Sequence, residues 1–486
     1  MVLNSLEFLL VANKGACLKS FIPALKGYAK SLARTAFRHA RQLRQDLPFH
    51  HWNVKREDGQ LSLHGVKLSE LRQRFSFPLH VVDEERLICN VHACQHEGDV
   101  ATYPVDLFYS YKTNPVPGVL RMIHDAGAGA EVISEFELWL ALKLGVDPSR
   151  IIYNGPAKTD ESLDEAVRRG ILAININHRE EIQRVRAAAR RVGGIANIGI
   201  RVVLPGGWAG QFGIAANDVE SAYREAMSYP ELNVIGIHCH NGHIYDSEQL
   251  WINSVTKILN ILGELSNSLG FIPKLIDFGG GMPIPTTRKL SWSDMRQSES
   301  LSIEPAQPNP DATPSLEFFS RSAGALTREF CLARGWPRPQ IVLESGRGVT
   351  GNAQLLLTEV LTTKATSQPY SYAVLDAGVN IASIVVHEFH QVFPVNDRPG
   401  AAGNDQHLYR LAGPICHLGD TLYPSWRLPQ LVPGDLLAIM DSGAYFIADS
   451  CSFSFGRPGV IAVDAKGSVR ELRRSESFED LLALDT

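Results

Sequence analysis

The sequence predicts an α/β protein in which a closed (β/α)8 barrel is followed by an all-β domain. Eight short runs rich in apolar and β-branched residues recur between residues 107 and 346, and helix-like segments separate most of them. A Gly-rich turn follows the seventh run, whereas an open doubly wound sheet carries this turn after its first strand. After about residue 350, strand-like runs joined by turns replace the alternating pattern. These three observations favour a barrel over an open sheet.

An N-terminal extension and lead-in is predicted over residues 1–75. Within it, LKSFIPALKGYAKSLARTAFRHARQLRQ carries apolar residues at helical spacing and a basic face, and we interpret residues 1–48 as one or two surface or dimer-packing helices. The run FPLHVVD follows a breaker and predicts a strand near residues 78–83, which we expect to join the C-terminal domain.

The barrel is predicted over residues 76–348. Helix-like segments such as DESLDEAVRRG end in a glycine, where a helix C-cap is expected. Residues 286–314 are rich in Ser, Pro and Gln and are expected to form a surface loop before the last helix. The expected strands are LFYSYK (107–112), GAEVIS (129–134), IIYNG (151–155), LAININ (172–177), IGIRVV (198–203), VIGIHCH (234–240), KLIDFGG (274–280) and QIVLESG (340–346).

The all-β domain is predicted over residues 349–486. Short apolar runs there are joined by turns and have no helix-like segments between them. The runs are QLLLTEVLTTKA (354–365), SYAVLDAG (371–378), HLYRLAG (407–413), DLLAIMDSGAYF (435–446) and GVIAVDA (459–465).

The composition favours a soluble, enzyme-sized protein whose partners are small molecules. The 486 residues are 44% hydrophobic and 20% charged, and the formal net charge of −5 is spread over interspersed acidic and basic residues, which argues against a nucleic-acid or anionic-membrane surface. The N-terminal run LEFLLVA lacks a basic leader, and no segment reaches the roughly 20 apolar residues of a membrane span, so we expect a cytoplasmic protein. The seven cysteines are scattered without a C-x-x-C spacing, which indicates neither a disulfide scaffold nor a zinc site.

The candidate catalytic residues lie where the barrel strands are expected to end, because barrel active sites are built there. Lys112 ends the first strand, where desolvation would lower its pKa toward that of an amine nucleophile; a lysine that extends into solvent is the alternative. Three glycines, 279–281, follow the seventh strand and leave backbone N–H groups open to an anion such as phosphate, with a flexible turn as the alternative.

The eighth and sixth strands add an acid, a guanidinium and an imidazole pair. Glu344 and Arg347 end the eighth strand, and the guanidinium could fork onto phosphate oxygens. His238 and His240 share one face of the sixth strand; a metal pair is one interpretation, but no third ligand is evident, so a ring-stacking or hydrogen-bonding role is favoured. Together, the lysine, the phosphate cradle, the acid and the imidazole describe a pyridoxal phosphate site.

Six motifs resemble, in order and spacing, those of the fold-type III pyridoxal phosphate-dependent decarboxylases, the diaminopimelate and ornithine decarboxylase-like enzymes. The motifs are FYSYKTNP, GIHCHNGH, LIDFGGGMP, LESGRG, GPICHLGD and SGAYFIADSCSFSF, and the similarity covers about residues 65–465 and is closest to the diaminopimelate decarboxylases. The resemblance implies an alanine-racemase-like barrel with a β domain and pyridoxal 5'-phosphate as cofactor. It also implies a head-to-tail homodimer whose active sites each borrow residues from the partner.

The resemblance further implies roles for individual residues. Lys112 is the expected Schiff-base lysine, His240 the imidazole that stacks on the cofactor ring, and Glu344 the partner of the pyridine nitrogen. Cys416 is the expected acid that reprotonates the substrate carbon from the other subunit after carbon dioxide departs. The other expected cofactor contacts are Arg201, His243, Gly279, Gly280, Gly281, Gly346, Arg347 and, from the partner chain, Tyr445, while His417 and Asp420 are the expected substrate contacts.

The sequence departs from the diaminopimelate decarboxylase pattern mainly at positions that hold substrate. His417 replaces the typical Glu that contacts the distal end of the substrate; the alternative is that His417 points away and another loop supplies specificity. Near the cofactor, His243 replaces a Ser beside the phosphate, and Ser345 replaces a Pro. The run IASIVVHEFH after LDAGVN lacks the usual Arg and Tyr that help to hold substrate. We therefore predict decarboxylation of an α-amino acid or an amino-acid conjugate by a rebuilt substrate site, with a specialised pathway such as siderophore or antibiotic biosynthesis as its setting.

Two other functions remain open on the same scaffold. One is an amino-acid racemase, but alanine racemases lack the GPxC loop that carries Cys416. The other is a non-catalytic regulatory homologue, against which Lys112, Glu344 and Cys416 together argue.

Overall fold

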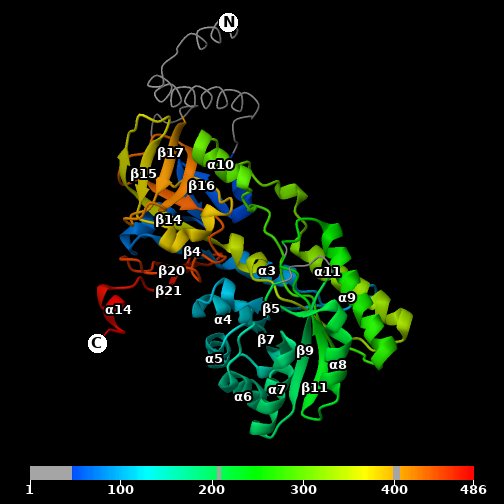
Figure 1. Ribbon diagram of the computed structural model, residues 1–486. Coiled ribbons are helices and arrows are strands. Elements are labelled where there is room, and N and C mark those ends of the chain that lie inside the picture. Colours follow the sequence, from blue (N-terminus) through cyan, green and yellow to red (C-terminus); the bar gives the residue numbers. More distant parts are fainter. Residues whose placement is uncertain (1–45, 205–209, 243, 398–405, 486) are drawn as a thin grey trace, which may run out of the picture.

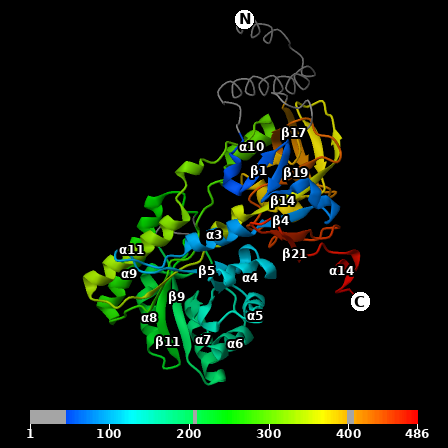
Figure 2. The ribbon, with the colours of Figure 1, turned by 180° about the vertical axis from the view of Figure 1, so that it is seen from behind.

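The computed structural model describes residues 46–485 except 205–209, 243 and 398–405. Within this part of the chain, a barrel and a sheet domain are stacked end to end, as both views show (Figures 1 and 2). The helices expected over residues 1–48 lie almost wholly outside the described residues.

Eight parallel strands close into the barrel. Strand β13 pairs with β5, and β8 pairs with β9, so the ring has no open edge. The strands are largely buried, as expected for a parallel sheet covered by helices outside and filled by side chains inside. This confirms the predicted fold class. In chain order the strands are β5 (Asp106–Ser110), β6 (Gly129–Val132), β7 (Ile151–Tyr153), β8 (Ala173–Ile176), β9 (Ala196–Val203), β11 (Leu232–His238), β12 (Leu275–Asp277) and β13 (Gln340–Leu343), and the two-residue β10 (Ile214–Ala215) pairs with β9.

Helices follow most of the barrel strands and cover the outer face of the barrel. Helix α6 ends at Gly170 and α11 ends at Gly335, both in the left-handed conformation that glycine adopts without strain. The covering helices are α3 (Glu84–Cys94), α4 (Pro117–Asp125), α5 (Glu135–Lys143), α6 (Asp160–Arg169), α7 (Arg179–Val192), α8 (Val219–Met227), α9 (Glu248–Leu269) and α11 (Leu316–Arg334).

The second domain is built on a nine-stranded sheet. Its main path runs β18-β17-β15-β14-β4-β20-β21, while β19 pairs with β14 and β16. Strand β4 (Leu79–Asp83) precedes the barrel in the chain, yet it pairs with β14 and β20 in this sheet. The other strands are β14 (Gln354–Lys364), β15 (Ser371–Leu375), β16 (Val392–Pro394), β17 (His407–Ala412), β18 (Thr421–Leu428), β19 (Leu436–Ile439), β20 (Gly459–Val463) and β21 (Val469–Arg473).

Two segments differ from the sequence expectation. The lead-in before β4 forms a small antiparallel sheet of β1 (Val54–Glu57), β2 (Gln60–Leu63) and β3 (Val66–Lys67). The insertion expected to be a loop contains α10 (Trp292–Leu301), which begins at a capping box formed by Ser291 and Asp294. Helix α10 lies against the sheet domain in both views, where it contacts β18 (Figures 1 and 2).

The remaining helical segments are short and lie mainly in the connections. Among the described residues, no helix combines the length and the hydropathy that a membrane crossing requires. These segments are α12 (Arg347–Thr350), α13 (Val379–Ala382), α14 (Phe478–Leu482) and the 3-10 helices η1 (Phe49–Trp52), η2 (Leu68–Gln73), η3 (Tyr111–Thr113), η4 (Pro148–Arg150), η5 (Ala216–Asp218), η6 (Pro310–Ala312), η7 (Gly351–Ala353) and η8 (Ser383–Val386).

Candidate active site

Lys112 lies just beyond the C-terminal end of β5, in η3. Its Nζ atom is 3.1 Å from Oε2 of Glu131, which is buried in β6, and 39% of the lysine side chain remains exposed. Burial alone would lower the pKa of Lys112, but the negative charges of Glu131 and Glu344 outweigh it and raise the pKa. The expectation of a lowered pKa from desolvation is therefore wrong for the chain without a ligand. Lys112 is an accessible cation beside buried carboxylates.

A buried amide links the two ends of the site. Nδ2 of Asn154 donates to Oε1 of Glu131 at 2.9 Å and to Oε1 of Glu344 at 2.6 Å. Asn175 donates in turn to Oδ1 of Asn154 at 2.8 Å. The lysine side and the Glu344 side of the site therefore belong to one hydrogen-bond network. Glu131, Asn154 and Asn175 were not predicted as site residues, although a polar residue inside an apolar strand run is a usable signal.

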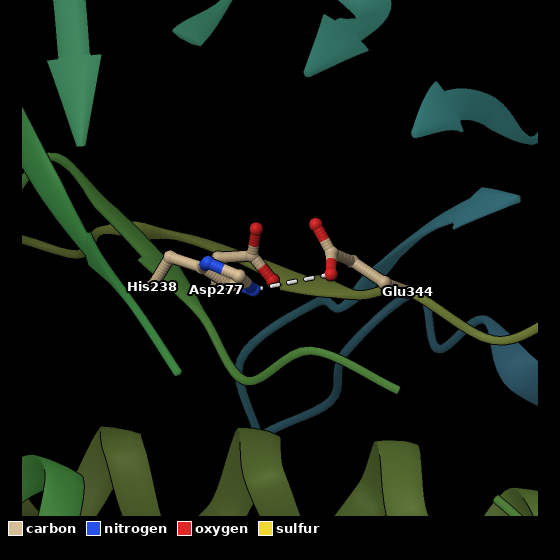
Figure 3. Close-up of side chains that lie close together, drawn as sticks. All are labelled: His238, Asp277 and Glu344. Carbon is tan, nitrogen blue, oxygen red and sulfur yellow. Dashed lines mark ion pairs between the residues drawn. The ribbon is translucent and has the colours of Figure 1, made fainter. Parts of the chain in front are cut away.

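Three buried side chains converge beneath this network. Figure 3 shows His238, Asp277 and Glu344, which come from the ends of β11, β12 and β13 and lie close together. Nε2 of His238 lies 3.2 Å from Oε2 of Glu344. Burial disfavours the ionised Glu344, but His238 and Lys112 outweigh this and hold the pKa of Glu344 well below its usual range. Burial and the charge of Glu344 raise the pKa of Asp277 well above its usual range, so Glu344 is the anion and Asp277 carries a proton.

His238, Asp277 and Glu344 form a group that could hold a metal ion. The sequence did not reveal such partners for His238. One candidate ligand atom from each residue lies within 4.8 Å of the others. However, Oδ1 of Asp277 already accepts the N–H of Gly279 at 2.9 Å, and Glu344 accepts from Asn154. The geometry is that of a proton-sharing network around one carboxylate.

His240 lies two residues beyond His238, just after the end of β11, and is partly buried. Its Nδ1 atom accepts the N–H of Gly280 at 3.0 Å, which fixes the ring. Burial, together with the positive charge of Lys112, lowers the pKa of His240 to about 3. The ring is therefore neutral at physiological pH and offers a flat surface. Arg201 lies nearby: its Nη2 donates to the carbonyl oxygen of His240 at 3.4 Å, and its guanidinium carbon lies 4.5 Å from the ring centroid of Phe212.

The glycine turns after β12 and β13 pack so closely that side chains would not fit. A Cβ on Gly280 would lie 2.3 Å from the carbonyl oxygen of Glu344, and one on Gly346 would lie 1.9 Å from Oγ1 of Thr113. The N–H groups of Gly279 and Gly280 already bond Asp277 and His240. The anion-binding role predicted for these turns therefore depends on Gly281 and Gly346.

Arg347 and Tyr445 differ from their predicted arrangement. Both terminal nitrogens of Arg347 donate to the carboxylate of Glu388, at 2.6 and 2.8 Å. They were expected to bind phosphate oxygens. Tyr445 was expected to serve the partner's site, yet its N–H donates to the carbonyl oxygen of Thr113 in the same chain at 2.9 Å. Its ring lies 5.2 Å from the guanidinium carbon of Arg347. Tyr445 therefore belongs to the surroundings of its own Lys112.

The predicted proton donor lies on the loop between β17 and β18. Cys416 is exposed, and Nδ1 of the neighbouring His417 accepts the N–H of Gly419 at 3.1 Å. Asp420 is buried, and its two carboxylate oxygens accept the N–H groups of Val379 and Ile415, each at 2.9 Å. Asp420 therefore holds this loop in place, in contrast to the substrate contact expected from the sequence. The predicted phosphate-side residue His243 lies outside the described residues.

Residues 89–351 match the family model described as pyridoxal-dependent decarboxylase, pyridoxal binding domain. The chain belongs to this family. It is 31% identical over 440 residues to the diaminopimelate decarboxylase of Methanothermobacter thermautotrophicus, covering 88% of this chain and 95% of that protein. It is 28% identical over 437 residues to the diaminopimelate decarboxylase of Aquifex aeolicus, covering 87% and 94%.

Solved structures share the fold of this chain. The crystal structure of AQ1208 from Aquifex aeolicus matches with a TM-score of 0.76 and 27% identity, covering 90% of this chain and all of that chain. A diaminopimelate decarboxylase from M. jannaschii, solved with L-lysine, matches in fold with a TM-score of 0.77, covering 89% and 97%. The predicted family, the decarboxylase class and the pyridoxal phosphate cofactor are thereby confirmed.

The residues of this pyridoxal-dependent decarboxylase fit the cofactor of its family. An accessible amine at Lys112, an anionic Glu344 across the same network and a neutral ring at His240 match the aldehyde, the ring nitrogen and the ring face of pyridoxal phosphate. Buried Thr113 supports the same fit, because its Oγ1 has no partner among the described residues and lies beside Gly346.

Proposed function

We propose that this pyridoxal-dependent decarboxylase removes the α-carboxyl group of an amino acid or an amino-acid conjugate, with substrate contacts that differ from those of the diaminopimelate decarboxylases. One observation carries the proposal: Glu131 and Asn154 join the Lys112 amine to the Glu344 carboxylate in one buried network. The network supports the proposal because pyridoxal phosphate needs an amine for its aldehyde and an anion beside its ring nitrogen.

The residues have separate tasks in this proposal. Bound pyridoxal phosphate supplies the electron sink for the electrons that remain when carbon dioxide departs. Nζ of Lys112 attaches the cofactor, and Glu344 keeps a proton on the ring nitrogen. His240 covers one face of the ring and excludes water there. Gly281 and Gly346 are the proposed phosphate contacts, and Arg201, which donates to the carbonyl oxygen of His240, is a further proposed cofactor contact.

Cys416 is the proposed proton donor, and it acts in the partner's site of a head-to-tail homodimer. The exposed thiol lies beside apolar side chains that are unusually open to solvent. Leu418 is fully exposed, and Phe453, whose ring centroid lies 6.3 Å from that of His417, is 52% exposed. A second copy that covers these side chains would bring Sγ of Cys416 toward a neighbouring barrel. The thiol would then donate its proton to the substrate carbon.

The substrate side of the site supports a substrate other than meso-diaminopimelate. His417 does not offer the fixed negative charge that the typical Glu gives to a distal ammonium group. The run IASIVVHEFH lacks the arginine that would fork onto a distal carboxylate. A specialised pathway, such as siderophore or antibiotic biosynthesis, is the setting that we propose for such a substrate.

The test is release of labelled carbon dioxide from carboxyl-labelled amino acids by the holoenzyme. The panel contains diamino acids, dicarboxylic amino acids and acyl conjugates of diamino acids, and the Lys112→Ala variant is the control. We expect release from at least one member and none with the variant. Racemisation without carbon dioxide would contradict the proposal in favour of a racemase, and inertness toward the whole panel would favour a non-catalytic role.

A further inference from the structure

Arg347 and Glu388 meet at the mouth of the barrel in a two-bonded ion pair. Nη1 of Arg347 lies 2.6 Å from one carboxylate oxygen of Glu388, and Nη2 lies 2.8 Å from the other. The side chains are 13% and 11% exposed, so solvent and salt screen the pair weakly. A fork of this kind is strong and directional. The terminal nitrogens of Arg347 are therefore committed to a protein carboxylate.

The pair is linked to the surroundings of Lys112 through Tyr445. Arg347 follows Glu344 by three residues, and its guanidinium carbon lies 5.2 Å from the Tyr445 ring. Tyr445 in turn bonds the backbone of Thr113, which follows Lys112. Glu388 also lines a cavity of about 350 Å³ between α10 and β18. Glu388 thus pairs with Arg347, near the surroundings of Lys112, and also lines a cavity that is large enough for a side chain.

The backbone around Glu388 is fixed by the insertion that contains α10. Glu388 forms an antiparallel bridge with Lys289. On either side of this bridge, the N–H of Leu290 donates to the carbonyl oxygen of His387 at 2.8 Å, and the N–H of Phe389 donates to the carbonyl oxygen of Arg288 at 2.9 Å. This pairing limits how far the Glu388 carboxylate can move away from Arg347.

The surroundings of Glu388 favour the ionised form of its carboxyl group. Burial disfavours the ionised form, but buried His390, whose Nε2 lies 3.7 Å from Oε2 of Glu388, and Arg347 outweigh this and lower the pKa. Oε1 of Glu388 has a second lone pair beyond the one that Arg347 occupies, whereas His390 lies beside Oε2. An incoming ligand therefore meets a negative carboxylate that can accept a hydrogen bond, together with a guanidinium whose charge is already balanced.

We propose that Glu388 determines substrate specificity: it favours an amino acid whose side chain ends in an N–H donor, an amine or an amide, and it disfavours one that ends in a carboxylate. This inference rests on the proposed function, because it concerns the substrate of the same site. A substrate N–H can bind the free lone pair of Glu388. A substrate carboxylate meets like charge and finds no free fork on Arg347.

A purely structural pair would behave differently. The insertion and the sheet domain are also joined by Glu304 and Arg427, whose side chains lie 2.6 Å apart. If the Glu388 pair only held domains together, its loss would lower thermal stability as the loss of the Glu304 pair does. It would not change the choice between two substrates of the same shape.

The test compares acids with their isosteric amides on the holoenzyme. The pairs are glutamate with glutamine, and 2-aminoadipate with its side-chain amide; kcat/KM and the Kd from calorimetry are measured for each member. We expect the wild-type enzyme to favour the amide, and Glu388→Gln to shift the acid-to-amide ratio toward the acid by at least tenfold. Glu388→Asp, which restores the charge, should return the ratio toward that of the wild type, and Glu304→Gln should leave it unchanged.

Two outcomes overturn the inference. One is a wild-type preference for the acids, and the other is an unchanged acid-to-amide ratio in a folded Glu388→Gln holoenzyme. The Kd ratio tests Glu388 even when no carbon dioxide is released. Binding without carbon dioxide release from any probe or from the labelled panel would contradict the proposed function while leaving the Kd ratio as the measure of this inference.

Discussion

Nε2 of His238 lies 3.2 Å from Oε2 of Glu344, and both side chains are buried. An imidazole next to a buried carboxylate stabilises its ionised form, whereas burial and then the charge of Glu344 raise the pKa of the neighbouring Asp277 and favour its protonated form. The end of the site that would face the cofactor's ring nitrogen therefore contains two acids with opposite protonation states. Substituting each acid by its amide therefore tests which of the two carries the negative charge.

Glu344→Gln should impair catalysis much more than Asp277→Asn. The first change removes the negative charge that keeps the ring nitrogen protonated, and we expect kcat to fall roughly 10²-fold, comparable to the loss of one preorganised electrostatic contact. The second replaces one neutral group by another of the same shape, so kcat should stay within about tenfold of the wild type. Steady-state kinetics of both purified holoenzymes measures the order of the effects, and the reverse order would contradict the assignment of the proton.

Cys416→Ala should lower kcat while leaving the cofactor bound. The proposed proton donor is absent in the variant, and general acid catalysis typically contributes about 10²–10⁴-fold. Cys451→Ala is the matched control, because Cys451 is another exposed cysteine with no assigned role. The visible absorbance of the cofactor should be the same in all three proteins. Equal kcat values for the two alanine variants would exclude the thiol as the proton donor.

Asp420→Ala should destabilise the loop that carries Cys416. Two backbone N–H groups, of Val379 and Ile415, would lose their acceptor, at about 1–3 kcal/mol for each buried group. We expect a lower free energy of unfolding and a lower kcat, with Asp420→Asn intermediate because its amide oxygen can still accept one bond. Denaturant unfolding followed by fluorescence measures the first effect. An unchanged midpoint for the alanine variant would contradict the loop-holding role.

Ionisation of the buried Asp441 carboxyl group should lower the free energy of unfolding as pH rises from about 4 to about 6. Burial raises the pKa of Asp441 from 3.8 to about 6, although Trp52 and Thr286 both donate to its Oδ1 at 2.7 Å. Since the folded state binds this proton more tightly than the unfolded state, stability is highest below pH 4 for this group and falls through the window. Asp441→Asn should remove about 2 kcal/mol of that fall between pH 4 and pH 6, as read from urea unfolding at the two pH values. If the free energy of unfolding of Asp441→Asn changed between pH 4 and pH 6 as much as that of the wild type, the raised pKa of Asp441 would be refuted.

Much of the barrel could be predicted from the sequence, because its buried parallel strands are continuous runs of apolar and β-branched residues. Strand β18 was missed because Pro424 interrupts its pattern, and β1 to β3 because they span only two to four residues. Helix α10 was hidden by the Ser- and Pro-rich composition around it, although its capping box was present in the sequence.

The site was predictable in its strand-end residues and less so in their partners. Lys112 and Glu344 follow apolar strands, which is a local pattern. The amide of Asn154 joins carboxylates from two other strands, and Glu388 pairs with Arg347 across 41 residues, so neither contact has a sequence signature. The charge of Lys112 was misjudged for the same reason: desolvation can be guessed from a strand end, but the opposing carboxylate of Glu131 appears only in three dimensions.

The central claim is that Lys112 holds pyridoxal phosphate for an amino-acid decarboxylation. The most direct measurement is borohydride reduction of the holoenzyme, followed by peptide mapping with mass spectrometry. The predicted result is loss of the visible cofactor band and retention of the cofactor's mass on the peptide that contains Lys112. Attachment at another lysine, such as the fully buried Lys158, or at none in a folded and cofactor-saturated protein, would contradict the account.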